Sequence, residues 1–184
     1  MQTQDTALDG VQILTPRRFD DPRGHFHEVW SPGALAMPVA QINQSFNRVP
    51  GTLRGLHCQA PPRAQAKLVY VPHGAIWDVA VDARRGSPTY GRWTAAELSA
   101  ETGRQLFVPA GFLHGFVTLV PETVVAYLCG DGYAPDCERS VRWDDPDLAI
   151  DWPLPQGGPT VSGRDAGAES WAAFDTPFSM DPRP

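Results

Sequence analysis

The sequence predicts an all-β fold, an antiparallel sandwich or jelly roll with few short helices. Segments rich in β-branched and aromatic residues alternate apolar and polar positions, as strands with one face toward a core do. Turn-forming residues separate these segments, since the chain of 184 residues has 17 glycines and 19 prolines. Many short strands with frequent turns are typical of antiparallel sandwiches and barrels.

The first half of the chain gives a weak helix signal and a strong strand signal. The segment 31–37, SPGALAM, is compatible with one short helical turn. The segment 67–84, KLVYVPHGAIWDVAVDAR, alternates on both sides of a Pro-His-Gly break, which predicts a hairpin. The segment 89–98, TYGRWTAAEL, predicts another strand with Trp93 on one face.

The second half continues in the same way. The segment 104–120, RQLFVPAGFLHGFVTLV, repeats the hairpin pattern with Pro-Ala-Gly as its break. The segment 123–130, TVVAYLCG, predicts a further strand. The tail 151–184 is rich in proline and glycine, and we expect it to wrap the barrel largely as loop or short helix. Because no internal repeat or linker is visible, residues 1–184 are expected to form a single domain.

Composition and charge narrow the functional class. A formal net charge of −6 argues against a nucleic-acid partner or an anionic membrane. The N-terminal segment lacks a basic region followed by an apolar run, and no apolar stretch approaches the ~20 residues that span a bilayer, so we expect a cytoplasmic protein. Cys58, Cys129 and Cys137 show no CxxC spacing, which indicates free thiols in a reducing compartment.

A cluster of basic and polar residues is unexpected in this acidic chain. In the segment 53–67, LRGLHCQAPPRAQAK, Arg54 precedes His57 by three residues and Lys67 follows it by ten. On two antiparallel strands these side chains could face one cavity, where they would bind a phosphate-bearing substrate and move a proton. A solvated surface loop is the alternative, and Lys67 by itself would be interpreted as a solvated strand lysine.

Tyr127 and Asp165 also have both a structural and a functional interpretation. Tyr127 lies in an apolar strand, where a core tyrosine needs a partner for its hydroxyl. It can donate a proton to a substrate only if the interior is a cavity. Asp165, in SGRD, would by default cap a helix or order a loop.

The histidines offer a metal site as an alternative. His25 and His27 form an HxH pattern that, together with His114, could belong to a metal-dependent cupin isomerase or dioxygenase. Arg23 directly before the pattern and the lack of a fuller set of ligand spacings argue against this alternative, so we expect no metal.

The blocks of the chain, taken in order, resemble the dTDP-4-dehydrorhamnose 3,5-epimerase family. They are FDDPRGHFHEVW, QINQSFN, GTLRGLHCQAPPRAQAKLV, GAIWDVAVDARRGSPTYGRW, ELSAETGRQLFVPAGFLHGF, YAPDCERSVRWDDPDLAIDWP and SGRD. The resemblance implies a cupin-like jelly roll that forms a homodimer, in which an N-terminal segment contacts the partner. It also implies a nucleotide-linked 4-keto-6-deoxyhexose substrate, dTDP-4-keto-6-deoxyglucose or a close variant, and no metal or redox cofactor.

The resemblance assigns catalytic roles to four residues. His57 would be the base, since a neutral imidazole suits proton abstraction near pH 7. Asp165 would bond the far ring nitrogen and fix the tautomer, as a triad aspartate does. Lys67 would hold the ketone oxygen as it becomes an enolate. Tyr127 would supply the proton on the opposite face of the sugar.

The resemblance also assigns substrate-binding positions. Arg54, with Arg23 donated by the partner chain, would bind the diphosphate through charge-assisted bidentate bonds. His114, oriented by Asp78, would line the same cavity. The remaining positions around the nucleotide and the sugar are Phe26, Glu28, Gln41, Asn43, Tyr133 and Glu138.

Three departures from the family pattern leave the reaction's scope open. Cys58 stands where an aromatic residue usually follows the catalytic histidine, Leu128 where lysine is common, and Gly132 where a second aromatic residue often stands. The alternative activity is therefore epimerisation at C3 only or at C5 only, on a related nucleotide-linked 4-ketosugar. A non-catalytic sugar-nucleotide-binding relative is a further alternative, against which the four catalytic residues argue.

Overall fold

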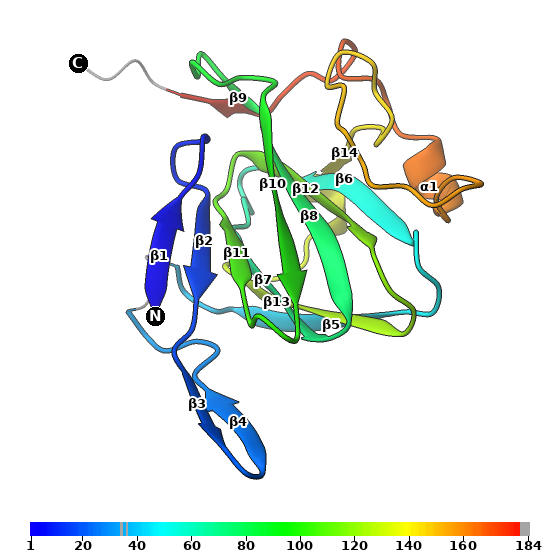
Figure 1. Ribbon diagram of the computed structural model, residues 1–184. Helices are drawn as coiled ribbons and strands as arrows, with labels where there is room; N and C mark the ends of the chain where they lie inside the picture. Colours follow the sequence, from blue (N-terminus) through cyan, green and yellow to red (C-terminus); the bar gives the residue numbers. More distant parts are fainter. Residues whose placement is uncertain (34, 36, 181–184) are drawn as a thin grey trace.

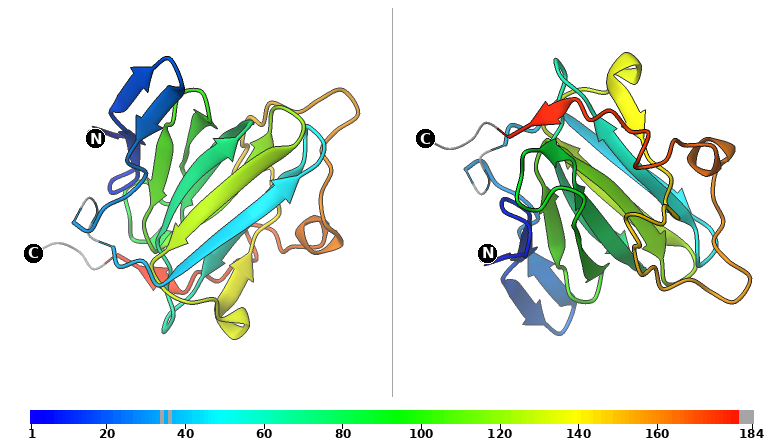
Figure 2. Two further views of the ribbon diagram at one scale, coloured as in Figure 1. Left: turned by 90° about the horizontal axis from the view of Figure 1, so that it is seen from below. Right: turned by 90° about the horizontal axis from the view of Figure 1, so that it is seen from above.

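Two antiparallel β-sheets face each other, and the computed structural model describes residues 1–33, 35 and 37–180 (Figures 1 and 2). The six-stranded sheet runs in the order β1 (Gln2–Asp5), β2 (Gln12–Thr15), β11 (Gln105–Val108), β7 (Lys67–His73), β13 (Thr123–Cys129) and β5 (Gln41–Asn47). The five-stranded sheet runs in the order β10 (Trp93–Ser99), β8 (Ala75–Asp82), β12 (Phe112–Thr118), β6 (Leu53–Gln59) and β14 (Glu138–Ser140). The predicted jelly roll is confirmed.

Four further pieces lie outside the two sheets. The antiparallel pair β3 (Arg18–Asp21) and β4 (Gly24–His27) forms a hairpin that extends away from the body (Figure 1). A short parallel pair joins β9 (Arg84–Arg85) to β15 (Phe178–Ser179) near the C-terminus. The helical pieces are a 3₁₀ turn, η1 (Pro135–Cys137), and a four-residue helix, α1 (Gly163–Ala166).

The space between the sheets is filled at one end by a hydrophobic core. Strand alternation builds it, because Ile76 and Ala80 of β8 face inward while Val79 and Val81 of the same strand face the outer layer. Each fully buried aliphatic or aromatic side chain contributes about 1.5–3 kcal/mol. The larger members of this inner core are Ile13, Val69, Val71, Ile76, Leu106, Phe112 and Phe116.

The prediction that residues 67–84 and 104–120 each form a hairpin is wrong. In each segment the first strand belongs to the six-stranded sheet and the second to the five-stranded sheet, so the chain crosses between sheets. The corners contain Gly74 and Gly111, whose φ angles of 87° and 97° few other residues adopt. The corner at Gly74 also packs against Thr123, which leaves no room for a Cβ atom. Alternating strands between two sheets is what makes the fold a jelly roll.

The outer face of each sheet is covered by a segment without regular structure. The tail after β14 lies against the five-stranded sheet and places Trp152 and Phe174 on Leu113 and its neighbours. Met37 and Trp30 cover part of the six-stranded sheet. The helical turn predicted over 31–37 includes residues 34 and 36, which lie outside the described residues. No helix in the described part of the chain is long and apolar enough to cross a membrane.

Candidate active site

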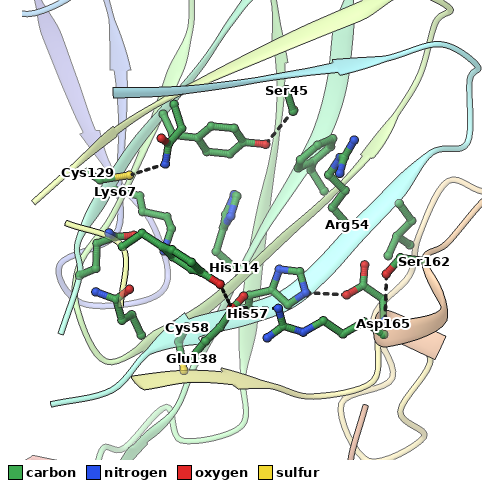
Figure 3. A pocket seen from close by; sticks show the side chains of 18 of the residues that line it. Ser45, Arg54, His57, Cys58, Lys67, His114, Cys129, Glu138, Ser162 and Asp165 are labelled. Carbon is green, nitrogen blue, oxygen red and sulfur yellow. Dashed lines mark hydrogen bonds and ion pairs between the residues drawn. The ribbon is translucent and has the colours of Figure 1, made fainter. Parts of the chain in front are cut away.

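A cavity of about 620 Å³ opens between the sheets at the end that the hydrophobic core does not fill (Figure 3). Strands of both sheets supply its wall, and the segment around α1 closes one side. The volume suits a small organic ligand. The structure brings to this cavity the predicted site residues Asn43, Arg54, His57, Lys67, His114, Tyr127, Tyr133, Glu138 and Asp165.

A β-bulge places Arg54 and His57 on the same face of β6. Residues three apart on a regular strand point to opposite faces. The pairing of β6 with β12 shifts register between His57 and Arg54, so both side chains face the cavity. Gly55 makes the bulge possible, because its φ is 137° and a Cβ there would lie 2.6 Å from Gly115 Cα.

His57 forms a hydrogen-bonded pair with Asp165, as predicted (Figure 3). His57 Nε2 lies 2.6 Å from Asp165 Oδ1, and the carboxylate is buried. Burial opposes the ionisation of Asp165, but hydrogen bonds from His57, Ser162 and the backbone of Gly55 outweigh it and hold the pKa of this carboxyl below its ordinary value. An ionised carboxylate only accepts, so Nε2 carries the proton in neutral His57 and Nδ1 has the free lone pair.

The C-terminal tail brings Asp165 to His57. The tail is hydrogen bonded to the start of β6, where Leu53 N donates to Thr160 O over 2.9 Å. Ser162 then caps α1 by accepting a hydrogen bond of 3.1 Å from Asp165 N. The carboxylate is therefore anchored to the same strand that carries its histidine.

Lys67 enters the cavity from the opposite sheet. Its Cα is paired with Cys129 on β13 and Val108 on β11, and burial lowers the pKa of its ammonium. Within the described residues no carboxylate forms an ion pair with it. Burial raises the pKa of the Cys58 thiol nearby to about 12, so this thiol stays neutral. Lys67 is thus a cation in the cavity wall available to an oxyanion.

Tyr127 is positioned on β13 with its hydroxyl in the cavity. The hydroxyl lies 3.2 Å from Ser45 Oγ, and the ring meets that of His114 edge-on with centroids 6.3 Å apart. Burial raises the pKa of Tyr127, so the phenol keeps its proton at neutral pH and can act as a donor.

His114 forms a second histidine–aspartate pair deeper in the fold. His114 Nε2 lies 2.7 Å from Asp78 Oδ1, as the resemblance implied. Asp78 is fully buried, and burial raises its pKa. The pair fixes the orientation of the His114 ring in the cavity wall.

Polar residues line the mouth of the cavity. Tyr133 donates a hydrogen bond of 2.7 Å to Glu138, which also pairs with Arg164 over 2.9 Å. Gln41 lies outside the cavity lining, but it bonds Asn43 over 2.7 Å and accepts from the backbone of Tyr133 over 2.8 Å. It therefore supports two residues at this mouth.

The N-terminal binding residues lie apart from this cavity. Arg23 and Phe26 belong to the extended β3–β4 hairpin, and Glu28 follows it. Arg23 pairs with Asp21 over 2.5 Å, and Phe26 is 71% exposed. The place of Arg23 in a partner's cavity and the roles of Phe26 and Glu28 around the ligand stay predictions.

The metal alternative gains no support from the geometry. His25 and His27 stack on the hairpin with ring centroids 5.4 Å apart, whereas His114 lines the cavity. Among the residues described, no group of three or more His, Cys, Asp and Glu side chains could hold a metal ion.

The three departures from the family pattern lie in different surroundings. Cys58 lines the cavity, while Leu128 packs in the outer cluster of the six-stranded sheet. Gly132 accepts a hydrogen bond from Gln59 at the cavity mouth. Of the three, Cys58 is therefore the change nearest the base, although its side chain is 4% exposed and packs in the outer layer of the five-stranded sheet.

Sequence reasoning missed several cavity residues. Ser45, Asn47, Ser162 and Arg164 take part in the hydrogen bonds around the cavity, but none was predicted. The polar residues at positions 41, 43, 45 and 47 of QINQSFN occur at every second position. This period of two places them on one strand face, and it was the available signal for Ser45 and Asn47.

The comparisons with known proteins agree with this geometry. A family model described as dTDP-4-dehydrorhamnose 3,5-epimerase matches residues 5–173. A dTDP-4-dehydrorhamnose 3,5-epimerase of Sinorhizobium fredii is 47% identical over 158 residues, which cover 83% of this chain and 81% of the relative.

Solved structures give the same result. A dTDP-6-deoxy-D-glucose-3,5-epimerase of Legionella pneumophila, in complex with dTDP-4-keto-L-rhamnose, is 38% identical with a TM-score of 0.92, covering 97% of this chain and 98% of that chain. A 3′-monoepimerase of Streptomyces bikiniensis, in complex with dTDP-quinovose, is 37% identical with a TM-score of 0.84, covering 91% of this chain and 86% of that chain. The chain therefore belongs to the dTDP-4-dehydrorhamnose 3,5-epimerase family.

Proposed function

We propose that this protein is an isomerase that epimerises dTDP-4-keto-6-deoxyglucose, or a close variant, at C3 and C5 in rhamnose-type deoxysugar biosynthesis. The observation that carries the proposal is the convergence of His57, Lys67 and Tyr127 on one cavity, with His57 held by Asp165. Family membership and the substrate-related complex of the Legionella pneumophila relative support it.

The residues supply each step of a proton-transfer epimerisation. The C4 ketone acidifies the hydrogens at C3 and C5, and His57 Nδ1 removes one of them as a base. The electron pair moves to the ketone oxygen, and the ammonium of Lys67 stabilises the resulting enolate. The hydroxyl of Tyr127 then protonates the same carbon from the opposite face, which inverts it.

The nucleotide end of the substrate is assigned to Arg54. Its Nε donates a hydrogen bond of 2.9 Å to Asn47 Oδ1, which holds the guanidinium at the cavity wall. A planar guanidinium so held suits bidentate recognition of a diphosphate. Arg54 thereby accounts for a phosphate site in a protein with a net charge of −6.

Epimerisation at a single carbon is the second candidate. The chain also resembles the 3′-monoepimerase of Streptomyces bikiniensis with a TM-score of 0.84. Cys58 directly follows His57 on β6 and packs behind it in the outer layer, where it can alter how the base meets C3 and C5 of the sugar.

Incubation with dTDP-4-keto-6-deoxyglucose in deuterated water, followed by NMR, tests the function. We expect deuterium at both C3 and C5, with inversion at both carbons, because each abstracted proton is replaced from solvent-equilibrated groups. Label and inversion at one carbon alone would support the single-carbon alternative. Unlabelled, unchanged substrate would contradict both and favour a binding protein.

We further propose a homodimer in which the β3–β4 hairpin contacts the partner. The hairpin exposes Phe19 and Phe26 by 52% and 71%, and the outer face of β5 exposes Ile42 and Phe46 by 67% and 52%. Apolar side chains gathered in this way are typical of an interface. Sedimentation equilibrium is expected to give the mass of two chains, and Phe26→Ser to weaken the association. A wild-type protein of monomer mass would contradict the proposal.

We also propose that residues 1–184 act as one domain and that the protein works in the cytoplasm. The three cysteines support this compartment, since all three are free thiols in the structure.

A further inference from the structure

A chain of hydrogen bonds runs along the cavity wall from Arg54 to Tyr127. Arg54 Nε lies 2.9 Å from Asn47 Oδ1, and Asn47 Nδ2 lies 3.3 Å from Ser45 Oγ. Ser45 Oγ in turn lies 3.2 Å from the Tyr127 hydroxyl (Figure 3). This chain of hydrogen bonds thus connects Arg54, which is assigned to the diphosphate, to Tyr127, which is assigned to protonation of the sugar.

The orientation of the Asn47 amide is determined by its neighbours. Asn47 is buried at 1% exposure, and the Nε–H of Arg54 can only donate, so it must face Oδ1. The carbonyl oxygen of Thr123, 3.0 Å from Nδ2, can only accept. The second hydrogen of Nδ2 is therefore directed at Ser45, and Ser45 accepts it.

This orientation makes the chain directional. Ser45 accepts from Asn47, so its own hydroxyl hydrogen is free to be donated to the oxygen of Tyr127. If Ser45 donates, the hydroxyl hydrogen of Tyr127 is free to point into the cavity. The donors of Arg54, Asn47 and Ser45 then point along the chain of hydrogen bonds toward Tyr127, and the Tyr127 hydroxyl is the donor left for the ligand.

We infer that Ser45 and Asn47 are positioning residues that direct the proton of Tyr127 toward the sugar and so control inversion. The inference rests on the proposed function and concerns its protonation step. Neither residue contacts the His57–Asp165 pair through a hydrogen bond in the described structure, so abstraction is left to that pair.

The proton balance shows where Ser45 acts. His57 keeps the abstracted proton and exchanges it with water. The enolate electron pair forms a new bond to the Tyr127 proton, which leaves a phenolate that later takes a proton from water. Burial raises the pKa of Tyr127, so this phenolate is costly without a donor. A hydrogen bond from Ser45 stabilises it.

The two steps can be separated by NMR in deuterated water with dTDP-4-keto-6-deoxyglucose. Deuterium exchange without inversion shows that His57 has removed a proton from the sugar and returned one to the same face. Inversion requires, in addition, a proton from Tyr127 on the opposite face. We expect Ser45→Ala to keep exchange near the wild-type rate and to slow inversion about 10- to 100-fold, as loss of a hydrogen bond to a charged oxygen does. Ser99→Ala is the matched control, because Ser99 has a similar hydroxyl contact of 3.1 Å to Thr102 outside the cavity.

A second variant separates positioning from folding. Ser45→Thr keeps the hydroxyl and is expected to keep the wild-type ratio of inversion to exchange. The inference would be overturned if Ser45→Ala left the ratio of inversion to exchange unchanged, or if it lowered the rates of inversion and exchange equally. The activity of the wild-type protein would still support the proposed function in that case. A wild-type protein that neither exchanges nor inverts would instead contradict the proposed function itself.

Discussion

Replacing His57 with alanine is expected to abolish deuterium exchange and inversion at both carbons of dTDP-4-keto-6-deoxyglucose. The imidazole is the cavity's base, because Asp165 accepts from Nε2 and leaves Nδ1 unprotonated toward the sugar. A positioned general base contributes about 10²- to 10⁴-fold. His114 forms a similar pair with Asp78, but its side chain is 8% exposed, against 30% for His57, so His57 is the imidazole that a sugar in the cavity can reach. We therefore expect the rates of deuterium exchange and inversion to fall by about 10⁴-fold, the upper end of this range.

Exchange measured by NMR is the decisive readout for His57→Ala, because it requires abstraction alone. Isothermal titration with dTDP checks that the cavity is intact, and we expect its Kd to change little. His73→Ala is the matched control, since His73 is exposed at the end of β7 and does not line the cavity. Exchange at the wild-type rate in His57→Ala would remove the base assignment.

The strands could be predicted from the sequence, but the way they pair could not. The alternation in 67–84 and 104–120 gives the strands β7, β8, β11 and β12 correctly. The same alternation is compatible with a hairpin and with a corner between two sheets, because both put every second residue on a core. What decides the corner at Gly74 is its contact with Thr123, which is distant in sequence.

The site was predicted by resemblance more than by residue spacing. The spacing of Arg54 and His57 would place them on opposite faces of a regular strand, and only the bulge at Gly55 makes them neighbours. The spacing of His57 and Lys67 predicted two antiparallel strands that face one cavity, but it did not indicate that these strands, β6 and β7, belong to opposite sheets. Asp165 lies 108 residues after His57, a separation from which local patterns give no information.

Replacing Lys67 with methionine is expected to lower kcat/KM about 10²- to 10³-fold, the usual cost of removing a preorganised group from a developing oxyanion. Methionine has a similar length and no charge, so the cavity keeps its shape. The base at His57 remains, and slow abstraction should persist. Michaelis kinetics of sugar inversion, followed by NMR, measures the change.

The pH dependence distinguishes an ammonium from a merely structural lysine at position 67. Burial lowers the pKa of Lys67 below its ordinary value of 10.5, so the charge is lost at a lower pH than in a solvated lysine. The charge is needed for enolate stabilisation, and kcat/KM of the wild type should therefore fall on the alkaline side through this lowered pKa.

Other groups in the cavity do not account for that alkaline fall. Burial raises the pKa of Tyr127, and that of Cys58 to about 12, so both keep their protons while Lys67 loses its own. Lys67→Met should remain slow across the range and lose the alkaline fall, because no charge is left to titrate. An alkaline fall of the same midpoint in Lys67→Met would show that another group controls it and that Lys67 does not stabilise the enolate through its charge.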